Sequence, residues 1–119
     1  MQINSSSNDR VEIVTLTGRL TMSETERAIK CLTDLLQQGR NLIVLDLENL
    51  EFVDSSGLAV FISYMKRTQQ AGGKVALSAL QPPVRSVLQL TRLHQVLDIF
   101  DSTQAAVDKL NQESATFET

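Results

Sequence analysis

The sequence alternates short apolar runs with longer stretches in which apolar residues recur every three or four positions. The clearest run, Leu42 to Leu45, is continuously apolar, which is typical of a strand with neighbours on both sides and at least one covered face. Further β-type runs lie at 11–17, 50–53, 74–80 and 96–100. Because parallel neighbours need long crossover connections, this alternation predicts an α/β domain with a largely parallel sheet.

The segments between the runs have helical periodicity. Capping-box spacing precedes the first helix, in Thr21 with Glu24 or in Ser23 with Glu26, and Gly39 ends it. The second helix runs from about Ser56 to Gln70. Its predicted apolar stripe consists of Leu58, Phe61, Ile62 and Met65.

Two further helices complete the pattern. One opens at Pro82-Pro83, where proline suits the first helical turn, and the other follows Asp101. A chain of 119 residues forms one domain that can bury a core without disulfides, and we place that core at about residues 8–110. We expect the polar stretches 5–9 and 111–119 to be frayed or flexible tails, with a short strand near 2–4 as a possible partner of the run at 11–17.

Composition argues against several classes of function. Cys31 and His94 are the only residues of their kinds, so we expect no intrachain disulfide, no zinc site and a reducing compartment. The N-terminus lacks the pattern of a signal peptide and no apolar stretch approaches bilayer length, which predicts a cytoplasmic protein with no membrane insertion. A net charge of −3 and five aromatic residues make nucleic acid an unexpected partner.

The sequence also lacks equipment for catalysis. It has no Walker-type phosphate loop, no dinucleotide fingerprint and no nucleophile elbow, because the segment Val53 to Gly57 has no leading glycine. We interpret His94 as a boundary residue rather than a base, and Cys31 as a small core residue rather than a nucleophile. We therefore expect no catalytic residues, no metal and no cofactor.

One polar segment has a specific physical logic. Asp54-Ser55-Ser56-Gly57 stands between a buried strand and a largely apolar helix, where backbone N–H groups have no intrahelical partner. The structural interpretation is a helix N-cap, which alone is the more frequent use of such a turn. The functional interpretation is a phosphorylated serine, because free amides and the helix dipole both favour an anion there.

The run from Leu42 to Val60, with Val53-Asp54-Ser55-Ser56-Gly57-Leu58 at its centre, resembles the central motif of STAS domains, specifically the stand-alone anti-sigma factor antagonists. Leu16-Thr17-Gly18 and Gly72-Gly73-Lys74-Val75 occupy the places that the family leads one to expect, so the resemblance covers about residues 8–110. It implies a STAS fold, with a mixed, largely parallel sheet of four to five strands packed against four to five helices.

The resemblance also implies a function without catalysis. Such proteins bind an anti-sigma factor that is also a serine protein kinase, and a PP2C-type phosphatase reverses the phosphorylation. The phosphorylated serine follows the motif aspartate, which corresponds to Ser55 here. The residues implied in partner binding are Asp54, Ser56, Gly57, Leu58, Arg19 and Thr21.

The chain departs from the family pattern just after its Leu-Thr-Gly turn. Where the family commonly has Glu-Leu-Asp, this sequence has Arg19-Leu20-Thr21, which leaves the identity of the partner open. The alternative function is a STAS accessory subunit in a transport or signalling complex. An enzyme that uses Ser55 as a nucleophile is the least favoured hypothesis, because only His94 offers a base.

Overall fold

A computed structural model describes residues 1–118, with side chains as far as Glu113. The strands are β1 (Gln2–Asn8), β2 (Val11–Leu20), β3 (Leu42–Asp46), β4 (Leu50–Val53), β5 (Lys74–Ser78) and β6 (Asp98–Phe100). The α-helices are α1 (Thr25–Gln37), α2 (Ser55–Gln70), α3 (Pro82–Leu90) and α4 (Thr103–Glu118). The two short 3₁₀ turns are η1 (Met22–Glu24) and η2 (Leu93–Gln95). The predicted alternation of strands and helices is confirmed.

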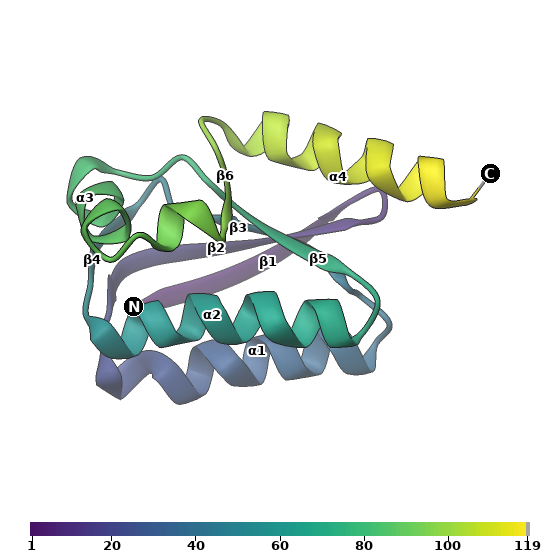
Figure 1. The fold of residues 1–119 in the computed structure, drawn as a ribbon. Coiled ribbons are helices and arrows are strands. Elements are labelled where there is room, and N and C mark those ends of the chain that lie inside the picture. The colour runs from purple at the N-terminus through teal and green to yellow at the C-terminus, as the bar shows by residue number, and fades with distance from the viewer. Residues whose placement is uncertain (119) are drawn as a thin grey trace.

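The strands form a mixed sheet in the order β1-β2-β3-β5-β6, with β4 paired to the carboxyl end of β2 (Figure 1). Only the β1–β2 hairpin is antiparallel among these pairs. The other pairs are parallel, and the chain between the two strands of each parallel pair contains at least one α-helix. Parallel neighbours need such a long crossover connection. The largely parallel sheet expected from the sequence is therefore confirmed, with one strand more than the four to five expected.

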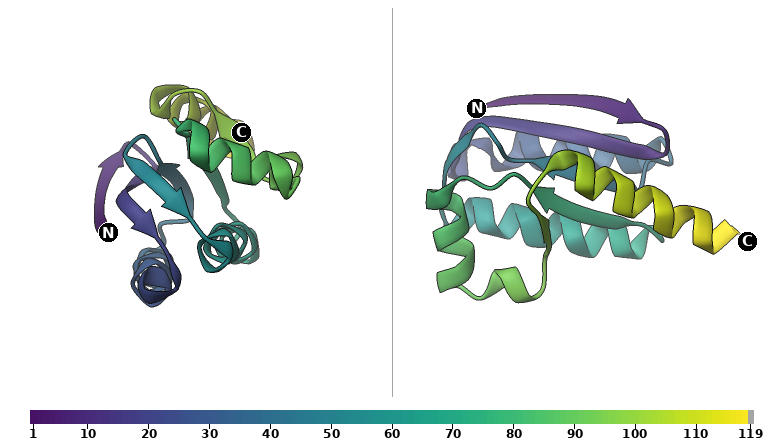
Figure 2. Two further views of the ribbon diagram at one scale, coloured as in Figure 1. Left: turned by 90° about the vertical axis from the view of Figure 1, so that its left-hand side faces the viewer. Right: turned by 90° about the horizontal axis from the view of Figure 1, so that it is seen from above.

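Helices cover both faces of the sheet. Helices α1 and α2 lie side by side on one face and α4 lies on the other, while α3 packs at one end (Figures 1 and 2). In β3, Ile43 and Leu45 face α1 and α2, whereas Val44 belongs to the cluster under α4. This two-sided burial explains why the run from Leu42 to Leu45 is continuously apolar rather than alternating.

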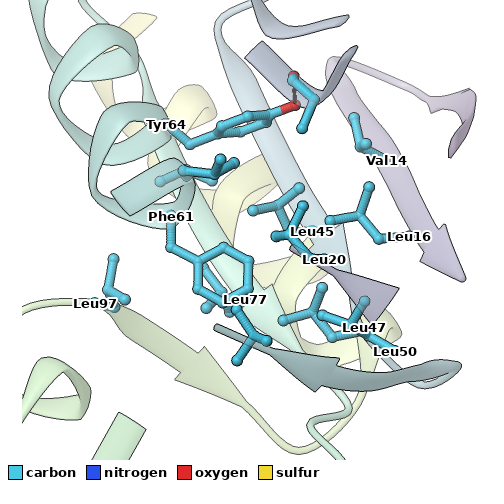
Figure 3. Packing of buried hydrophobic residues seen from close by; sticks show 14 of the residues in the cluster. Val14, Leu16, Leu20, Leu45, Leu47, Leu50, Phe61, Tyr64, Leu77 and Leu97 are labelled. Carbon is cyan, nitrogen blue, oxygen red and sulfur yellow. Dashed lines mark hydrogen bonds between the residues drawn. The ribbon is translucent and has the colours of Figure 1, made fainter. Parts of the chain in front are cut away.

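The main hydrophobic core fills the space between the sheet and helices α1 and α2 (Figure 3). Its largest fully buried side chains are Phe61 and Tyr64, both from α2. Buried leucines surround them, namely Leu16, Leu20, Leu45, Leu50 and Leu77 from four strands and Leu47 from the turn between β3 and β4 (Figure 3). The buried stripe of α2 is Gly57, Val60, Phe61, Tyr64 and Thr68, so it is rotated from the predicted stripe, of which Leu58 and Met65 are only partly buried.

A smaller core holds α4 against the other face of the sheet. Val11, Val44 and Ala76 from the strands pack against Ala106, Val107 and Leu110 of the helix. At the edge of this contact the Lys74 Nζ lies 3.1 Å from Glu113 and 3.4 Å from Asp98. The hydrogen bond to Glu113 is the main cause that raises the pKa of Lys74, so its ammonium stays charged while it joins the helix to two strands.

The N-terminal end of the chain differs from the sequence-based expectation. Residues 5–8, predicted as part of a frayed tail, extend β1 to Asn8, because every residue of this polar stretch pairs with β2. Ladder hydrogen bonds satisfy the backbone whatever the side chains are, so the polar composition did not prevent a strand. At the other end, the segment from Asn111 onward continues α4 as far as Glu118, and Thr119 lies outside the described residues.

The predicted capping boxes before α1 are wrong. Neither Thr21 nor Glu24 makes a side-chain cap, and the Thr21 Oγ1 instead lies 3.3 Å from the Ser23 Oγ. The chain enters α1 through η1. The amide of Met22, the first residue of η1, donates to the carboxylate of Asp54, which lies 32 positions further along the sequence. At α4 the cap is Ser102, whose Oγ accepts the Ala105 amide at 3.1 Å.

Replacement of Tyr64 by phenylalanine tests the joint between α1 and α2. The buried Tyr64 hydroxyl donates to the Ala28 carbonyl of α1 at 2.6 Å, while burial raises the pKa of the phenol and keeps it protonated. Tyr64→Phe removes this bond without opening a cavity, so we expect a loss of about 1 to 2 kcal/mol in the free energy of unfolding. Urea denaturation measures it, and an unchanged midpoint would contradict the assigned role of the bond.

Candidate functional site

The candidate site lies where β4 ends and α2 begins. Helix α2 starts directly after the strand and its first turn packs closely against β2 and β4. A Cβ at Gly57 would lie 2.6 Å from the Leu20 carbonyl and would also overlap the Val53 side chain. Only glycine permits this approach, so the glycine of the motif positions the start of α2 on the sheet.

Asp54 is the N-cap of α2 and ties two separate segments together. Its Oδ1 accepts the Gly57 amide at 2.9 Å, and its Oδ2 accepts the Met22 amide of η1 at 3.1 Å. Its own amide donates to the Leu20 carbonyl at 3.2 Å. The N-cap predicted from the sequence is confirmed, and the same carboxylate also fixes η1 beside the first turn of α2.

Ser55 and Ser56 follow in the first turn of α2. The Ser55 side chain is exposed and that of Ser56 is half-buried. Asp54 accepts the amides of Gly57, through its side chain, and of Leu58, through its carbonyl at 3.0 Å. The Ser55 hydroxyl stands at the positive end of this 16-residue helix, and the first-turn amides that Asp54 does not bind, those of Ser55 and Ser56, are the ones that a phosphate there could meet.

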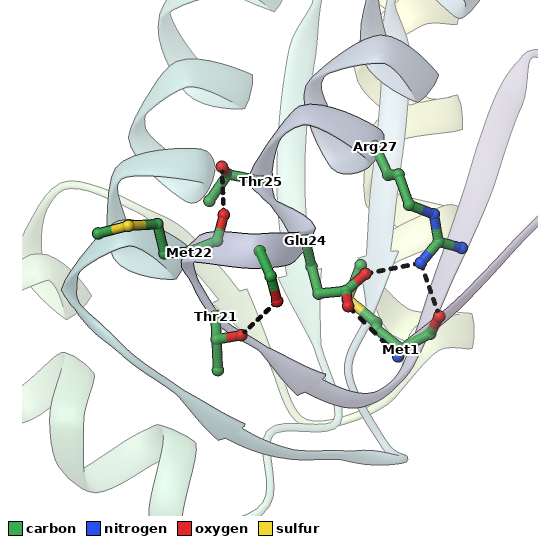
Figure 4. A network of polar contacts seen from close by, with 7 residues as sticks. Met1, Thr21, Met22, Glu24, Thr25 and Arg27 are labelled. Carbon is green, nitrogen blue, oxygen red and sulfur yellow. Dashed lines mark hydrogen bonds and ion pairs between the residues drawn. The ribbon is translucent and has the colours of Figure 1, made fainter.

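The neighbouring turn η1 presents an apolar side chain. Met22 has 73% of its surface exposed although the Asp54 carboxylate accepts its amide. Figure 4 shows its side chain pointing away from the polar contacts of the turn. Local bonds complete the turn, because the Thr25 Oγ1 donates to the Met22 carbonyl at 2.9 Å. Glu24 pairs with Arg27 at 2.6 Å, and Arg27 also donates to the Met1 carbonyl. Met22 is thus an exposed methionine on an ordered support.

Arg19 and Thr21, which stand where the family commonly has Glu and Asp, lie in environments that differ from each other. The Arg19 guanidinium carbon lies 4.2 Å from the centre of the Phe52 ring, over the paired ends of β2 and β4. Thr21 precedes η1 and is half-buried. Leu58, the last of the predicted partner-binding residues, is partly buried against the core at the first turn of α2.

Met22 and Phe52 are not among the residues predicted from the sequence to bind a partner. Both are among the few large hydrophobic residues that the described chain exposes, Phe52 at 37%. Phe52 meets Arg19 through a bulged pairing of β4 with β2, and Met22 meets Asp54 across 32 positions of sequence. No local pattern contains either pairing.

We define the α2/η1 surface as Thr21, Met22, Asp54, Ser55, Ser56 and Leu58.

The residues considered for other chemistry lie elsewhere. Cys31 is partly buried against the main core. Burial is the main cause that raises the pKa of its thiol, and the negative charge of Asp34 raises it further, so the nucleophilic thiolate is disfavoured. His94 is exposed in η2, where it lines a hollow with Leu88 and Asp101. Across the described residues, we find no group of three or more His, Cys, Asp or Glu side chains placed to hold a metal ion.

The chain is similar to known proteins over most of its length. A model of the STAS domain family matches residues 2–106. The chain belongs to the STAS domain family. An anti-sigma F factor antagonist from Paenibacillus polymyxa is 32% identical to this STAS domain over 111 residues, which are 92% of this chain and 95% of the relative.

Solved structures show the same fold. A candidate anti-sigma factor antagonist from Thermotoga maritima has a TM-score of 0.86 and 28% identity, with 92% of this STAS domain and 94% of that chain covered. The anti-sigma factor antagonist SpoIIAA in its unphosphorylated form has a TM-score of 0.73 and 23% identity, covering 92% and 98%. SpoIIAA of Bacillus has also been solved in the phosphorylated form, with a TM-score of 0.70. The expected STAS fold is therefore confirmed.

No helix in the described part of this STAS domain is both long and apolar enough to cross a bilayer.

Substitution of Asp54 tests the tie between α2 and η1. Asp54→Ala removes the acceptor of both amides, so we expect a loss of about 1 to 2 kcal/mol in stability and faster hydrogen exchange at the Met22 and Gly57 amides. Asp54→Asn retains one acceptor oxygen, so only one of the two amides should stay protected. Exchange rates as in the wild type for both amides in Asp54→Ala would contradict the proposed tie.

Proposed function

We propose that this STAS domain is an anti-sigma factor antagonist that binds an anti-sigma factor with serine kinase activity and is switched off by phosphorylation of Ser55. The observation that carries the proposal is the exposed Ser55 hydroxyl in the first turn of α2, directly after the capping Asp54. The names of the relatives support the partner class. The partner would carry out the chemistry and this chain would be its substrate.

The α2/η1 surface suits a docking role. Its side chains are apolar or small and polar except for the Asp54 carboxylate, whose two oxygens already accept main-chain amides. The exposed Met22 and the partly buried Leu58, three residues after Ser55 in α2, offer an apolar contact, and methionine adapts its shape to a partner at little cost. Arg19, stacked on Phe52 at the paired ends of β2 and β4, adds a positive charge two residues before Thr21.

Phosphorylation would change the charge of this surface without unfolding it. Transfer of the γ-phosphoryl group of ATP to the Ser55 Oγ releases ADP and the hydroxyl proton and adds about −1.5 to −2 charges. The amides at the start of α2 can accommodate the phosphate, so the modified domain stays folded. Desolvation of that charge in the complex, at about 2–4 kcal/mol, would weaken binding roughly 30- to 1000-fold.

The switch must also be reversible. Hydrolysis of the phosphoserine by a PP2C-type phosphatase would return the hydroxyl to Ser55 and restore binding. Exposure of Ser55 at the margin of the helix makes it accessible to both enzymes. A cycle of this kind controls transcription, so we place the protein in the bacterial cytoplasm, where it would release a sigma factor by binding the anti-sigma factor.

Phosphorylation by the serine kinases of the source bacterium tests the assignment of the site. After incubation with ATP and each purified anti-sigma kinase, we expect mass spectrometry to find one phosphate, on Ser55. Ser55→Ala should abolish the modification, whereas Ser56→Ala, the matched control one residue away, should keep it. Modification of Ser55→Ala at the wild-type rate would contradict the proposal.

Isolation of the protein from its source cells separates this function from the alternative. Recovery with a serine kinase supports the antagonist function. Recovery with a transporter ATPase and no kinase would instead support an accessory subunit of a transport complex. This alternative is retained because Arg19 and Thr21 stand where the family commonly has Glu and Asp, which leaves the identity of the partner open.

A further inference from the structure

Strand β1 forms one edge of the sheet. It pairs with β2 through all seven of its residues, and in the described part of the chain no strand pairs with its other side. Figure 2 shows the strand along the outside of the molecule. In a strand paired on one side only, about half of the N–H and C=O groups point outward, where they can bond another strand.

This edge lacks the features that usually block such pairing. Between Gln2 and Asn8 there is no charged residue and no proline, and the pairing with β2 has no register shift. The opposite edge is protected, because β6 has only three residues and its Asp98 pairs with Lys74. Since proteins commonly protect long edges with charge, proline or a bulge, an edge of seven residues without these features is open to pairing with another strand.

The surroundings of the strand have charges of both signs. A groove of about 500 Å³ separates β1 from α1 and is lined by residues that include Ser5, Lys30 and Asp34. Lys30 and Asp34 lie one turn apart on α1, with the Lys30 Nζ 3.0 Å from the Asp34 Oδ2. Both side chains remain well exposed, at 76% and 49%.

The strand and the helix run alongside each other, so this charge pair can be placed along β1. Near the start of β1, the Arg27 Nη1 donates to the Met1 carbonyl at 3.0 Å. Near its end, the Arg40 Nη1 donates to the Ser7 Oγ at 2.9 Å. Lys30 and Asp34 fall between Arg27 and Arg40, so they lie beside the middle of the strand.

We propose that β1 pairs antiparallel with β1 of a second copy of this chain, so that the two sheets become one. A two-fold axis perpendicular to the sheet, near the middle of β1, puts both α1 helices on the same face and runs them in opposite directions. Lys30 then faces the same gap as the partner's Asp34, and Asp34 the same gap as the partner's Lys30. The Lys30 and Asp34 charges are therefore complementary under the symmetry of the pair. The same axis brings Arg27 towards the partner's Arg40, but each arginine already pairs with a carboxylate of its own chain, Arg27 with Glu24 and Arg40 with Glu12.

A second copy fits this edge better than a charged partner segment. The strand offers main-chain groups and small uncharged side chains, so its own sequence is a suitable complement and an acidic or basic peptide gains nothing from it. The contact is one strand wide and smaller than the roughly 800 Å² per partner of a stable interface. We expect a weak dimer that forms at about 20–500 µM and leaves the α2/η1 surface exposed in both copies.

Sedimentation equilibrium of the full chain at about 150 mM salt tests the pairing. The average mass should rise from one towards two chain masses over this concentration range. Asn4→Lys places two like charges within one or two residues of each other across the axis, so it should weaken association about tenfold or more. Gln70→Lys adds the same charge at the exposed end of α2 and should associate as the wild type does.

Disulfide trapping tests the geometry. In a Cys31→Ser background, Asn4→Cys or Ser5→Cys should form a cross-linked dimer on mild oxidation, because facing residues of antiparallel strands have Cα atoms about 4.5–5.5 Å apart. Gln70→Cys in the same background is the control and should not cross-link faster than free collision allows. Circular dichroism checks that each variant is folded.

Three results would overturn the proposal. The first is an average mass of one chain at every concentration up to about 500 µM, which would mean that the edge of β1 does not bind a second copy. The second is equal association of Asn4→Lys and the wild type. The third is the absence of cross-linking at both β1 positions. None of these results depends on a kinase, so the pairing can fail while the proposed function holds, and the reverse.

Discussion

Burial of β3 and β5 from both sides is the constraint on which the rest of the structure depends. Residues 43 and 45 face α1 and α2 while Val44 faces α4, so neither strand has a polar face to leave in water. Helices must therefore cover both faces, and the strands between them must be joined by crossovers. In such a sheet the carboxyl ends of the parallel strands gather at one end, which is where α2 begins and where α/β sheets commonly bind their partners.

At that end the position of the candidate site depends on one carboxylate. Asp54 accepts amides from the first turn of α2 and from η1, so Ser55 and Met22 keep a fixed relation although they are far apart in the sequence. Gly57 completes the arrangement by allowing close contact with β2. A charge added at Ser55 would therefore fall in the middle of an ordered surface, and a local change of charge could control binding without a change of fold.

Much of this was predictable from residue patterns. The order of elements, the parallel sheet, the bounds of β4 and the cap of α2 all depend on local periodicity or on a four-residue turn. The rest depends on contacts between distant segments: the extension of β1 through its polar serines, the long-range bond that replaces a capping box before α1, and the stacking of Arg19 on Phe52. Such pairings follow from the register of strands, which no short stretch of sequence encodes.

The most direct measurement is the affinity of the partner kinase for the domain with phosphoserine incorporated at position 55 during synthesis, compared with the unmodified domain. Titration calorimetry with a non-hydrolysable nucleotide keeps the modification state fixed. Affinity should fall at least about 30-fold for phosphoserine at position 55, with an unchanged circular dichroism spectrum. Equal affinities of the two forms would contradict a switch based on charge at the start of α2.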